Sequence, residues 1–207
     1  MVIDDNSTDR SIDYLTEIEK QHPEIRVIFR DTRLGIGSAH LLGLVEAKKT
    51  NFKFLLTMDA DLTHLVSDAK RVIEAINESD LVIGSRYLGH ADIHGWSKLR
   101  IFLTHFGHRI TSEFFSSDID MSSGLRAYRL ENLPLDTLLK NCPLNYEFFF
   151  ISALVYLKEN LRVDEIRVTL KQRGAGQSKM SFRLVIKGAT QLFLYALRIK
   201  RIRKPLL

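Results

Sequence analysis

The stretch FKFLLTMDADLTH, residues 52–64, decides the fold of this chain. Its first half is an apolar run typical of a buried strand, and its second half is an acidic loop. Asp59 and Asp61 therefore follow a strand, at the sheet edge where α/β proteins bind ligands. Two carboxylates at this spacing can chelate a hard divalent cation that also contacts phosphate oxygens. A D-x-D pattern also occurs by chance or as a helix cap, so the inference of a cation site depends on the position of this pattern after a strand.

Alternating strands and helices extend from this stretch in both directions. The expected strands are residues 2–3, 25–29, 52–60 and 80–85, and the expected helices are 9–21, 38–49 and 67–79. In the first helix Ile12, Leu15 and Ile18 share one face, and Ser7 or Thr8 is placed to cap it. The alternation predicts an α/β fold with a mostly parallel, doubly wound sheet and covering helices.

The pattern changes after Tyr87. Residues 90–115 are rich in histidine and aromatic side chains, which favours a helical insertion with loops. A strand (123–129), a helix (146–160), a further strand (162–173) and an amphipathic helix (181–203) are expected to follow. We therefore expect one α/β domain over residues 1–175 and a C-terminal appendage of basic amphipathic helices over residues 176–207.

Charge and composition narrow the function classes. The chain has 207 residues, is 45% hydrophobic and carries a net charge of +5, with five basic residues in RIKRIRK at 198–204. That cluster suits anionic lipid or nucleic acid, or it is a solvated tail. The single Cys142 excludes an internal disulfide framework and a cysteine zinc site, which indicates a reducing compartment.

Membrane-spanning segments are not predicted. The first residues lack the basic and apolar runs of a secretory signal peptide. The longest apolar runs, residues 148–157 and 191–197, are too short to cross a bilayer. We expect a protein that lies on a membrane rather than one that crosses it.

Two glycine-rich loops are candidate phosphate contacts. RLGIGSAHLLG (33–43) and RGAGQSK (173–179) both lack the Gly-Lys-Ser/Thr order of a P-loop, and the first also fails the dinucleotide spacing. The first is interpreted either as a tight turn that allows close helix packing or as a ligand contact. In the second, Arg173 and Lys179 flank a flexible segment that suits closure over a diphosphate.

Other charged residues follow expected strand ends. Asp4 and Asp5 should reach the same sheet edge as Asp59, while Asn6 and Ser7 also fit a turn and a helix cap. Several basic residues are placed to face one cleft, and some of them are ordinary surface charges: Arg86, Arg100, Arg126, Arg173 and Lys179. The seven histidines show no metal-ligand spacing.

Seven motifs in order resemble the family 2 glycosyltransferases of the GT-A fold, specifically the dolichyl-phosphate mannosyltransferase group. They are IDDNSTD (3–9), RLGIGSAHLLGL (33–44), MDADLTH (58–64), IGSRY (83–87), WSKLR (96–100), DMSSGLRA (120–127) and RGAGQSK (173–179). Each motif is weak alone, but together they cover almost the whole chain. The resemblance implies a Rossmann-like GT-A sheet and transfer of mannose from GDP-mannose, or of another sugar from a UDP-sugar, onto dolichyl or another polyprenyl phosphate with inversion.

The resemblance also implies roles for individual residues. Ile3, Asp5 and Ala60 match donor-nucleotide contacts, and Asp59 and Asp61 match the loop that binds Mg²⁺ or Mn²⁺ and the diphosphate. Three basic residues match positions that hold the donor phosphates: Arg86, Arg173 and Lys179. The acceptor side is matched by Arg100, Asp120, Ser123 and Gly124. Asp59, Asp61 and Arg86 are the expected catalytic residues.

A cytoplasmic protein, peripheral on the cytoplasmic face of a membrane, is expected from this resemblance and from the basic tail, with a membrane partner subunit as a further expectation. Two alternatives stay open. One is a catalytically inactive glycosyltransferase-like fragment or partner subunit. The other is a basic module that binds anionic lipid or nucleic acid, although most phenylalanines lie in apolar helix runs and no nucleic-acid partner is predicted.

The family's first strand, which is central in its sheet, has no counterpart in this sequence. Without it, the backbone groups of two neighbouring strands lose their partners. We hypothesise that the sequence is a truncated or mis-started version of a complete enzyme. Coding sequence upstream of Met1 without an in-frame strand would count against this hypothesis.

Overall fold

The computed structural model of this chain describes residues 1–88, 98–115, 117–169, 190 and 194, with the backbone alone at 98–104 and 114. Its strands are β1 (Val2–Asp4), β2 (Val27–Phe29), β3 (Phe54–Thr57), β4 (Leu81–Ser85), β5 (Arg126–Arg129) and β6 (Val163–Arg167). Its helices are α1 (Ser11–Gln21), α2 (Ile36–Lys48), α3 (Val66–Glu74), the 3-10 turn η1 (Ala75–Glu78), α4 (Lys98–Phe115), α5 (Leu135–Asn141) and α6 (Glu147–Lys158).

The strands form two sheets. β1 and β2 pair in parallel, and the second sheet has the order β3-β5-β4-β6. β5 is antiparallel to β3 and to β4, while β6 is parallel to β4, so three strands of the second sheet share one direction. This arrangement confirms the predicted α/β class. β1 and β3 each have one edge without a strand partner among the residues that the structure describes.

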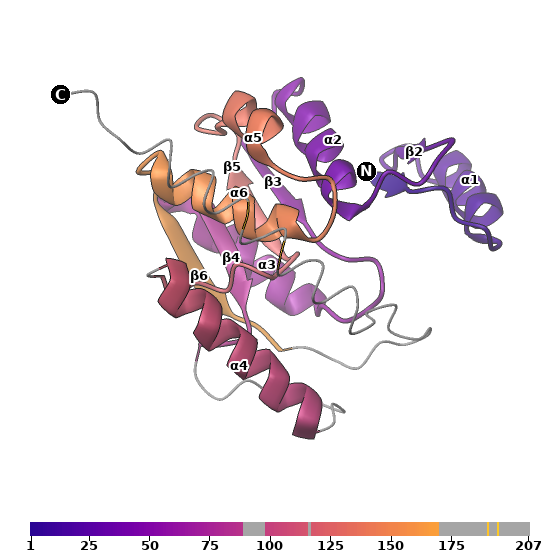
Figure 1. Cartoon of the computed structure of the whole chain (residues 1–207). Helices are drawn as coiled ribbons and strands as arrows, with labels where there is room; N and C mark the ends of the chain where they lie inside the picture. Colours follow the sequence, from indigo (N-terminus) through magenta and orange to yellow (C-terminus); the bar gives the residue numbers. More distant parts are fainter. Residues whose placement is uncertain (89–97, 116, 170–189, 191–193, 195–207) are drawn as a thin grey trace.

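Helices cover both faces of the four-stranded sheet (Figure 1). Alternate residues of β4 point to opposite faces, so Leu81 and Ile83 join one core cluster and Val82 joins the other. The first cluster includes buried residues of α2, α5 and α6, and the second includes residues of α3 and η1. The carboxyl ends of β3 and β4 thus emerge between two packed layers, which fixes where their loops begin.

The N-terminal unit of β1, α1 and β2 lies to one side of the larger sheet (Figure 1). No residue of α1 is buried, and Ile12 on its predicted apolar face is exposed, because this helix covers only two strands. The prediction of a Ser7 or Thr8 cap is wrong. Arg10 occupies the cap position without a side-chain hydrogen bond, and Ser7 donates instead to the Asp4 carboxylate.

Several element boundaries differ from the expected ones. α5 was not expected, and β5 begins three residues later than predicted because residues 120–124 form a loop. The helix expected at 181–203 and the appendage at 176–207 lie outside the described residues, apart from isolated positions in α-helical conformation at 190 and 194. Within the described ranges, none of the helices combines the length and apolarity needed to cross a bilayer.

Arg126 lies inside the protein although its side chain is charged. It is 0% exposed and donates to the carbonyls of Ser123 (2.8 Å), Met121 (3.0 Å) and Phe149 (2.8 Å). It also donates to Ser152 Oγ at 2.8 Å. The guanidinium therefore joins the loop before β5 to helix α6, with every bond made to a buried group.

The glycine-rich segment at 33–43, which includes the start of α2, packs against residues 143–145 of the same chain. Gly35 has φ of 91°, a conformation that glycine adopts without strain. A Cβ on Gly37 would lie 2.6 Å from the backbone oxygens of Pro143 and Asn145, and the Ser38 N–H donates to the Leu144 carbonyl at 3.0 Å. Of the two interpretations of this loop, the contacts support close packing.

Replacing Arg126 by Met should lower the free energy of unfolding by about 3 kcal/mol or more, because buried carbonyls lose charge-assisted hydrogen bonds. Urea unfolding at an unchanged m-value measures the loss. The control is Arg26→Met, which removes an arginine that is 66% exposed and should change stability by less than about 0.5 kcal/mol. Equal effects of the two changes would contradict the proposed role of Arg126.

Gly37→Ala and Gly43→Ala form a matched pair within α2. At Gly37 the new methyl group meets backbone atoms at 2.6 Å, whereas at Gly43 the nearest atom, Ile3 Cδ1, lies at an ordinary 3.6 Å. Thermal unfolding should therefore show a clear loss of stability for Gly37→Ala. Gly43→Ala should be neutral or stabilising by up to about 1 kcal/mol through helix propensity. The opposite ranking would refute the packing role of Gly37.

Candidate active site

The acidic loop after β3 presents Asp59 beside a glycine. Asp59 is 36% exposed at its side chain, and a Cβ on Gly124 would lie 3.1 Å from Asp59 Oδ1. Thr57 Oγ1 donates to the Gly124 carbonyl at 3.0 Å, which ties the end of β3 to the loop before β5. Glycine at 124 thus keeps open the space next to this carboxylate.

Asp61 organises the turn of the same loop. Its Oδ1 accepts hydrogen bonds from the Thr63 N–H (3.1 Å) and the Thr63 hydroxyl (2.6 Å). Leu62 between them has φ of 63°, so the chain bends sharply there. The two hydrogen bonds from Thr63 hold the Asp61 carboxylate in this turn.

Arg86 follows β4 and is held by the loop before β5. Its Nε and Nη2 donate to Asp120 at 3.0 and 3.1 Å, its backbone N–H donates to Asp120 Oδ2 at 3.2 Å, and Nη2 also donates to Ser122 Oγ. This bidentate ion pair is largely buried, with side-chain exposures of 16% for Arg86 and 0% for Asp120.

The pair remains ionised. Burial disfavours both charges, but the attraction and hydrogen bonds between the partners outweigh it, so the pKa of Asp120 is lowered and that of Arg86 is raised. Asp59 also contributes to raising the pKa of Arg86, which places the two predicted catalytic residues within electrostatic reach of each other. The structure thus brings Asp59, Arg86, Asp120 and Gly124 together through the loop before β5.

Asp5 organises the N-terminal loop. Its Oδ1 accepts from Arg30 (2.8 Å) and the Leu34 N–H (2.9 Å), and its Oδ2 accepts from the Gly35 N–H (2.9 Å). Burial opposes its ionisation, but these bonds outweigh that effect and lower its pKa. Ile3 lies in β1 and is half-buried. The structure therefore gives Asp5 a structural role in its own loop.

The remaining predicted residues differ in how far the structure describes them. Ser123 is buried, and its carbonyl accepts a hydrogen bond from Arg126, which lies in the core rather than facing the site. Arg100 lies in α4, where the backbone alone is described at that position. Arg173 and Lys179 lie outside the described residues.

Two histidines near Asp59 were not predicted. His64 Nε2 lies 3.8 Å from Asp59 Oδ2 with its ring 5% exposed, and His40 packs against Phe148 and Phe149 with ring centroids 5.3 and 4.9 Å away. Burial, with a smaller contribution from Arg126, lowers the pKa of His40 to about 4, although Asp59 opposes the shift. His40 is therefore neutral at pH 7. His64 is the last residue of the MDADLTH motif, and this position is the sequence feature that could have revealed it.

Asp59 and Asp61 are the residues that fit a divalent cation. Two carboxylates combined with phosphate oxygens and water are a common donor set for Mg²⁺. The space that Gly124 leaves beside Asp59 Oδ1 agrees with a ligand at that carboxylate. No group of three or more His, Cys, Asp or Glu side chains placed to hold a metal occurs within the described ranges.

Characterised relatives match most of this chain. An undecaprenyl-phosphate mannosyltransferase of Micrococcus luteus is 29% identical over 182 residues, which are 87% of this chain and 75% of that protein. A dolichol-phosphate mannosyltransferase of Saccharomyces cerevisiae is 28% identical over 200 residues, which are 92% of this chain and 71% of that protein.

A solved structure has the same fold. Glucosyl-3-phosphoglycerate synthase from Mycobacterium tuberculosis, in complex with phosphoglyceric acid, matches with a TM-score of 0.62 and 16% identity over 95% of this chain and 67% of that one. This likeness confirms the predicted GT-A architecture. The sequence model of glycosyl transferase family 2 matches residues 1–133, which is more than half of the chain. With the acidic loop of β3 and Arg86 both inside that range, this chain belongs to glycosyl transferase family 2.

Proposed function

We propose that this chain transfers mannose from GDP-mannose to a polyprenyl phosphate, with inversion at the anomeric carbon. The observation that carries the proposal is the loop before β5, which places Gly124 beside Asp59 and clamps the guanidinium of Arg86 through Asp120. The mannosyltransferase names of both curated relatives supply the sugar and the lipid class. When the sugar is transferred, the departing nucleoside diphosphate develops negative charge. Arg86 would stabilise that charge.

Asp59 and Asp61 would hold a Mg²⁺ or Mn²⁺ ion, whose chemistry is to neutralise charge on the diphosphate oxygens. Structures of the M. tuberculosis synthase include complexes with Mn²⁺ and UDP-glucose, so the fold accommodates such an ion. Thr63 holds Asp61 in place through two hydrogen bonds, and Gly124 leaves Asp59 accessible. The acidic loop is therefore preorganised for the diphosphate.

Arg86 would stabilise the leaving diphosphate. Its orientation is fixed before substrate arrives, since Asp120 holds two of its nitrogens. A donor that is already oriented needs no reorganisation when charge develops, and this is the main source of electrostatic catalysis. Asp120 acts in this proposal by positioning Arg86, because its own carboxylate is fully buried.

The acceptor would be a lipid phosphate. A phosphate monoester with its second pKa near 6 is largely dianionic at neutral pH, so no general base is needed. In-line attack opposite the leaving diphosphate gives inversion. Arg173 and Lys179 are proposed to close over the donor phosphates, and Arg100 to face the acceptor phosphate. The basic cluster at 198–204 would hold the protein at the cytoplasmic face of a membrane.

Nucleotide binding should be metal-dependent. GDP at about 100 times its Kd should stabilise the protein by roughly 2.7 kcal/mol, seen as a raised Tm. Asp59→Asn and Asp61→Asn should abolish the part of this shift that requires Mg²⁺ or Mn²⁺. Asp13→Asn, at an exposed position of α1, serves as the control and should keep the whole shift. A wild-type protein that GDP does not stabilise, with or without metal, would refute nucleotide binding.

Transfer should depend on Arg86. Wild-type protein incubated with polyprenyl phosphate and labelled GDP-mannose should yield a labelled lipid, and the same assay with labelled UDP-glucose tests the nucleotide and the sugar. Arg86→Lys keeps the charge but loses the bidentate geometry, so kcat should fall by about 100-fold. Arg71→Lys, an arginine that is 53% exposed, is the matched control and should transfer normally. Lipid labelling that is unchanged in Arg86→Lys would remove Arg86 from the mechanism.

A further inference from the structure

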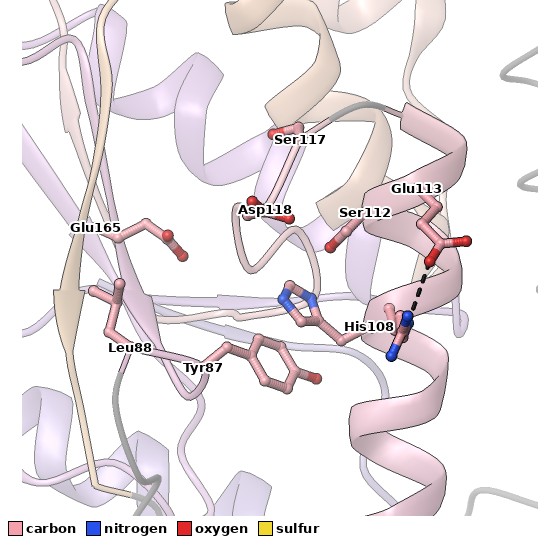
Figure 2. Close-up of a pocket in the computed structure, with 9 residues that line it drawn as sticks. Tyr87, Leu88, His108, Ser112, Glu113, Ser117, Asp118 and Glu165 are labelled. Carbon is pink, nitrogen blue, oxygen red and sulfur yellow. Dashed lines mark hydrogen bonds and ion pairs between the residues drawn. The ribbon is translucent and has the colours of Figure 1, made fainter.

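Two cavities of the described structure lie at opposite ends of the four-stranded sheet and differ in charge. The first, of about 660 Å³, lies between α4 and the ends of β4 and β6 (Figure 2). Its described lining carries three carboxylates, those of Glu113, Asp118 and Glu165. The arginine that lines it, Arg109, already pairs with Glu113 at 3.2 Å. This cavity therefore disfavours an anionic ligand.

The second cavity, of about 590 Å³, lies where β3 begins and β5 ends. Phe54 pairs with Arg129 at this end, whereas Thr57 at the other end of β3 leads into the acidic loop. The cavity and the candidate active site thus lie at opposite ends of one strand. Among the described residues that line this cavity, three are basic and one is acidic: Lys48, Lys53, Arg129 and Glu131. A concave site of this size with a predominantly positive lining suits a small anionic molecule.

Two of the cations are held in place by backbone carbonyls. Lys48 Nζ donates to the Leu130 carbonyl at 2.6 Å. Arg129 Nε donates to the Ser79 carbonyl at 3.0 Å, and its Nη2 donates to two carbonyls of η1 at 2.7 and 2.6 Å. The contact of Arg129 Nε with the Asp80 carboxylate is long, at 3.9 Å. Because carbonyls are neutral, these hydrogen bonds fix the two cations without cancelling their charge.

An aromatic ring lies beside these cations. Phe52 lines the cavity and is 75% exposed. The next residue, Lys53, is held at the cavity by its carbonyl, which accepts from the Leu130 N–H at 2.9 Å. The amides of Asn51 and Asn77 add hydrogen-bond donors and acceptors to the lining. An exposed aromatic ring next to fixed cations suits a ligand that combines a flat ring with phosphate, because bases of any identity stack on such a ring.

We propose that this cavity is a second nucleotide site, in which Lys48, Lys53 and Arg129 receive the phosphate groups and Phe52 stacks on the base. The site goes beyond the proposed function, because it lies at the other end of β3 from Asp59. Its own cations neutralise the phosphates, so binding here requires no divalent metal. A bare phosphate ion or a phospholipid headgroup offers the same anion but no ring for Phe52.

Isothermal titration calorimetry with ADP in the presence of EDTA tests the site without metal-dependent binding. Wild-type protein and Asp59→Asn should bind ADP equally. Lys53→Gln should weaken binding by about tenfold or more, as expected for a lost charge-assisted hydrogen bond, and Phe52→Ser by about fivefold or more through lost stacking. Lys140→Gln and Tyr14→Ser, which change an exposed lysine and an exposed aromatic residue elsewhere, should bind as the wild type does.

Two further probes separate the sources of phosphate. Inorganic phosphate should bind at least about tenfold more weakly than ADP, because it cannot stack on Phe52. Flotation with vesicles that contain phosphatidylglycerol should be the same for the wild type and Lys53→Gln. Equal affinity for phosphate and ADP, or vesicle binding that Lys53→Gln abolishes, would overturn the nucleotide assignment. So would a wild-type protein that does not bind ADP in EDTA, or ADP binding that Asp59→Asn removes and Lys53→Gln leaves unchanged.

Discussion

The buried guanidinium of Arg126 is the interaction on which the site depends. It donates to Met121, Ser123, Phe149 and Ser152, and so fastens the loop before β5 to helix α6. That loop carries Gly124 against Asp59 and Asp120 against Arg86. Three of these bonds are made to backbone carbonyls, so the position of the loop depends on the main chain more than on other side chains. One loop thereby contacts both the acidic loop and Arg86, although 25 or more residues separate these two in the sequence.

A second carboxylate supports this arrangement from β6. Glu165 Oε1 accepts a hydrogen bond from the Asp120 N–H at 2.7 Å, while parallel pairing places Glu165 opposite Ile83 in β4. The same strand pair therefore positions Arg86, at the end of β4, and the loop that holds it. Buried polar networks of this kind specify a geometry when every member has its partners.

Local sequence patterns predict part of this structure. An apolar run followed by D-x-D predicts a strand and its acidic loop, and strand–helix alternation predicts the α/β class, because both depend on neighbours in sequence. The Arg86–Asp120 pair spans 34 residues and the contact of Gly37 with Pro143 spans more than 100, so no local period reveals either. Arg126 resembles its exposed counterparts in sequence, because its burial depends on carbonyls of the preceding loop and of α6 that only the fold brings around it. Arg86 is a candidate because it follows an expected strand, whereas Asp120 is identified only through the resemblance to a family.

The split between the two sheets bears on the hypothesis of a further strand. α2 is the element that joins the two parts: its buried residues enter the main core, whereas Gly43 faces Ile3 of β1 and Ser38 Oγ accepts from Arg30. A two-stranded sheet is marginally stable alone, and within the described ranges β1 and β3 each have one edge without a strand partner. A strand bonded to both edges would unite the sheets and align the Asp5 loop with Asp59, since β1 and β3 both lead into acidic loops. The hydrogen bonds that Asp5 accepts from Arg30, Leu34 and Gly35 hold the loop after β1 in place.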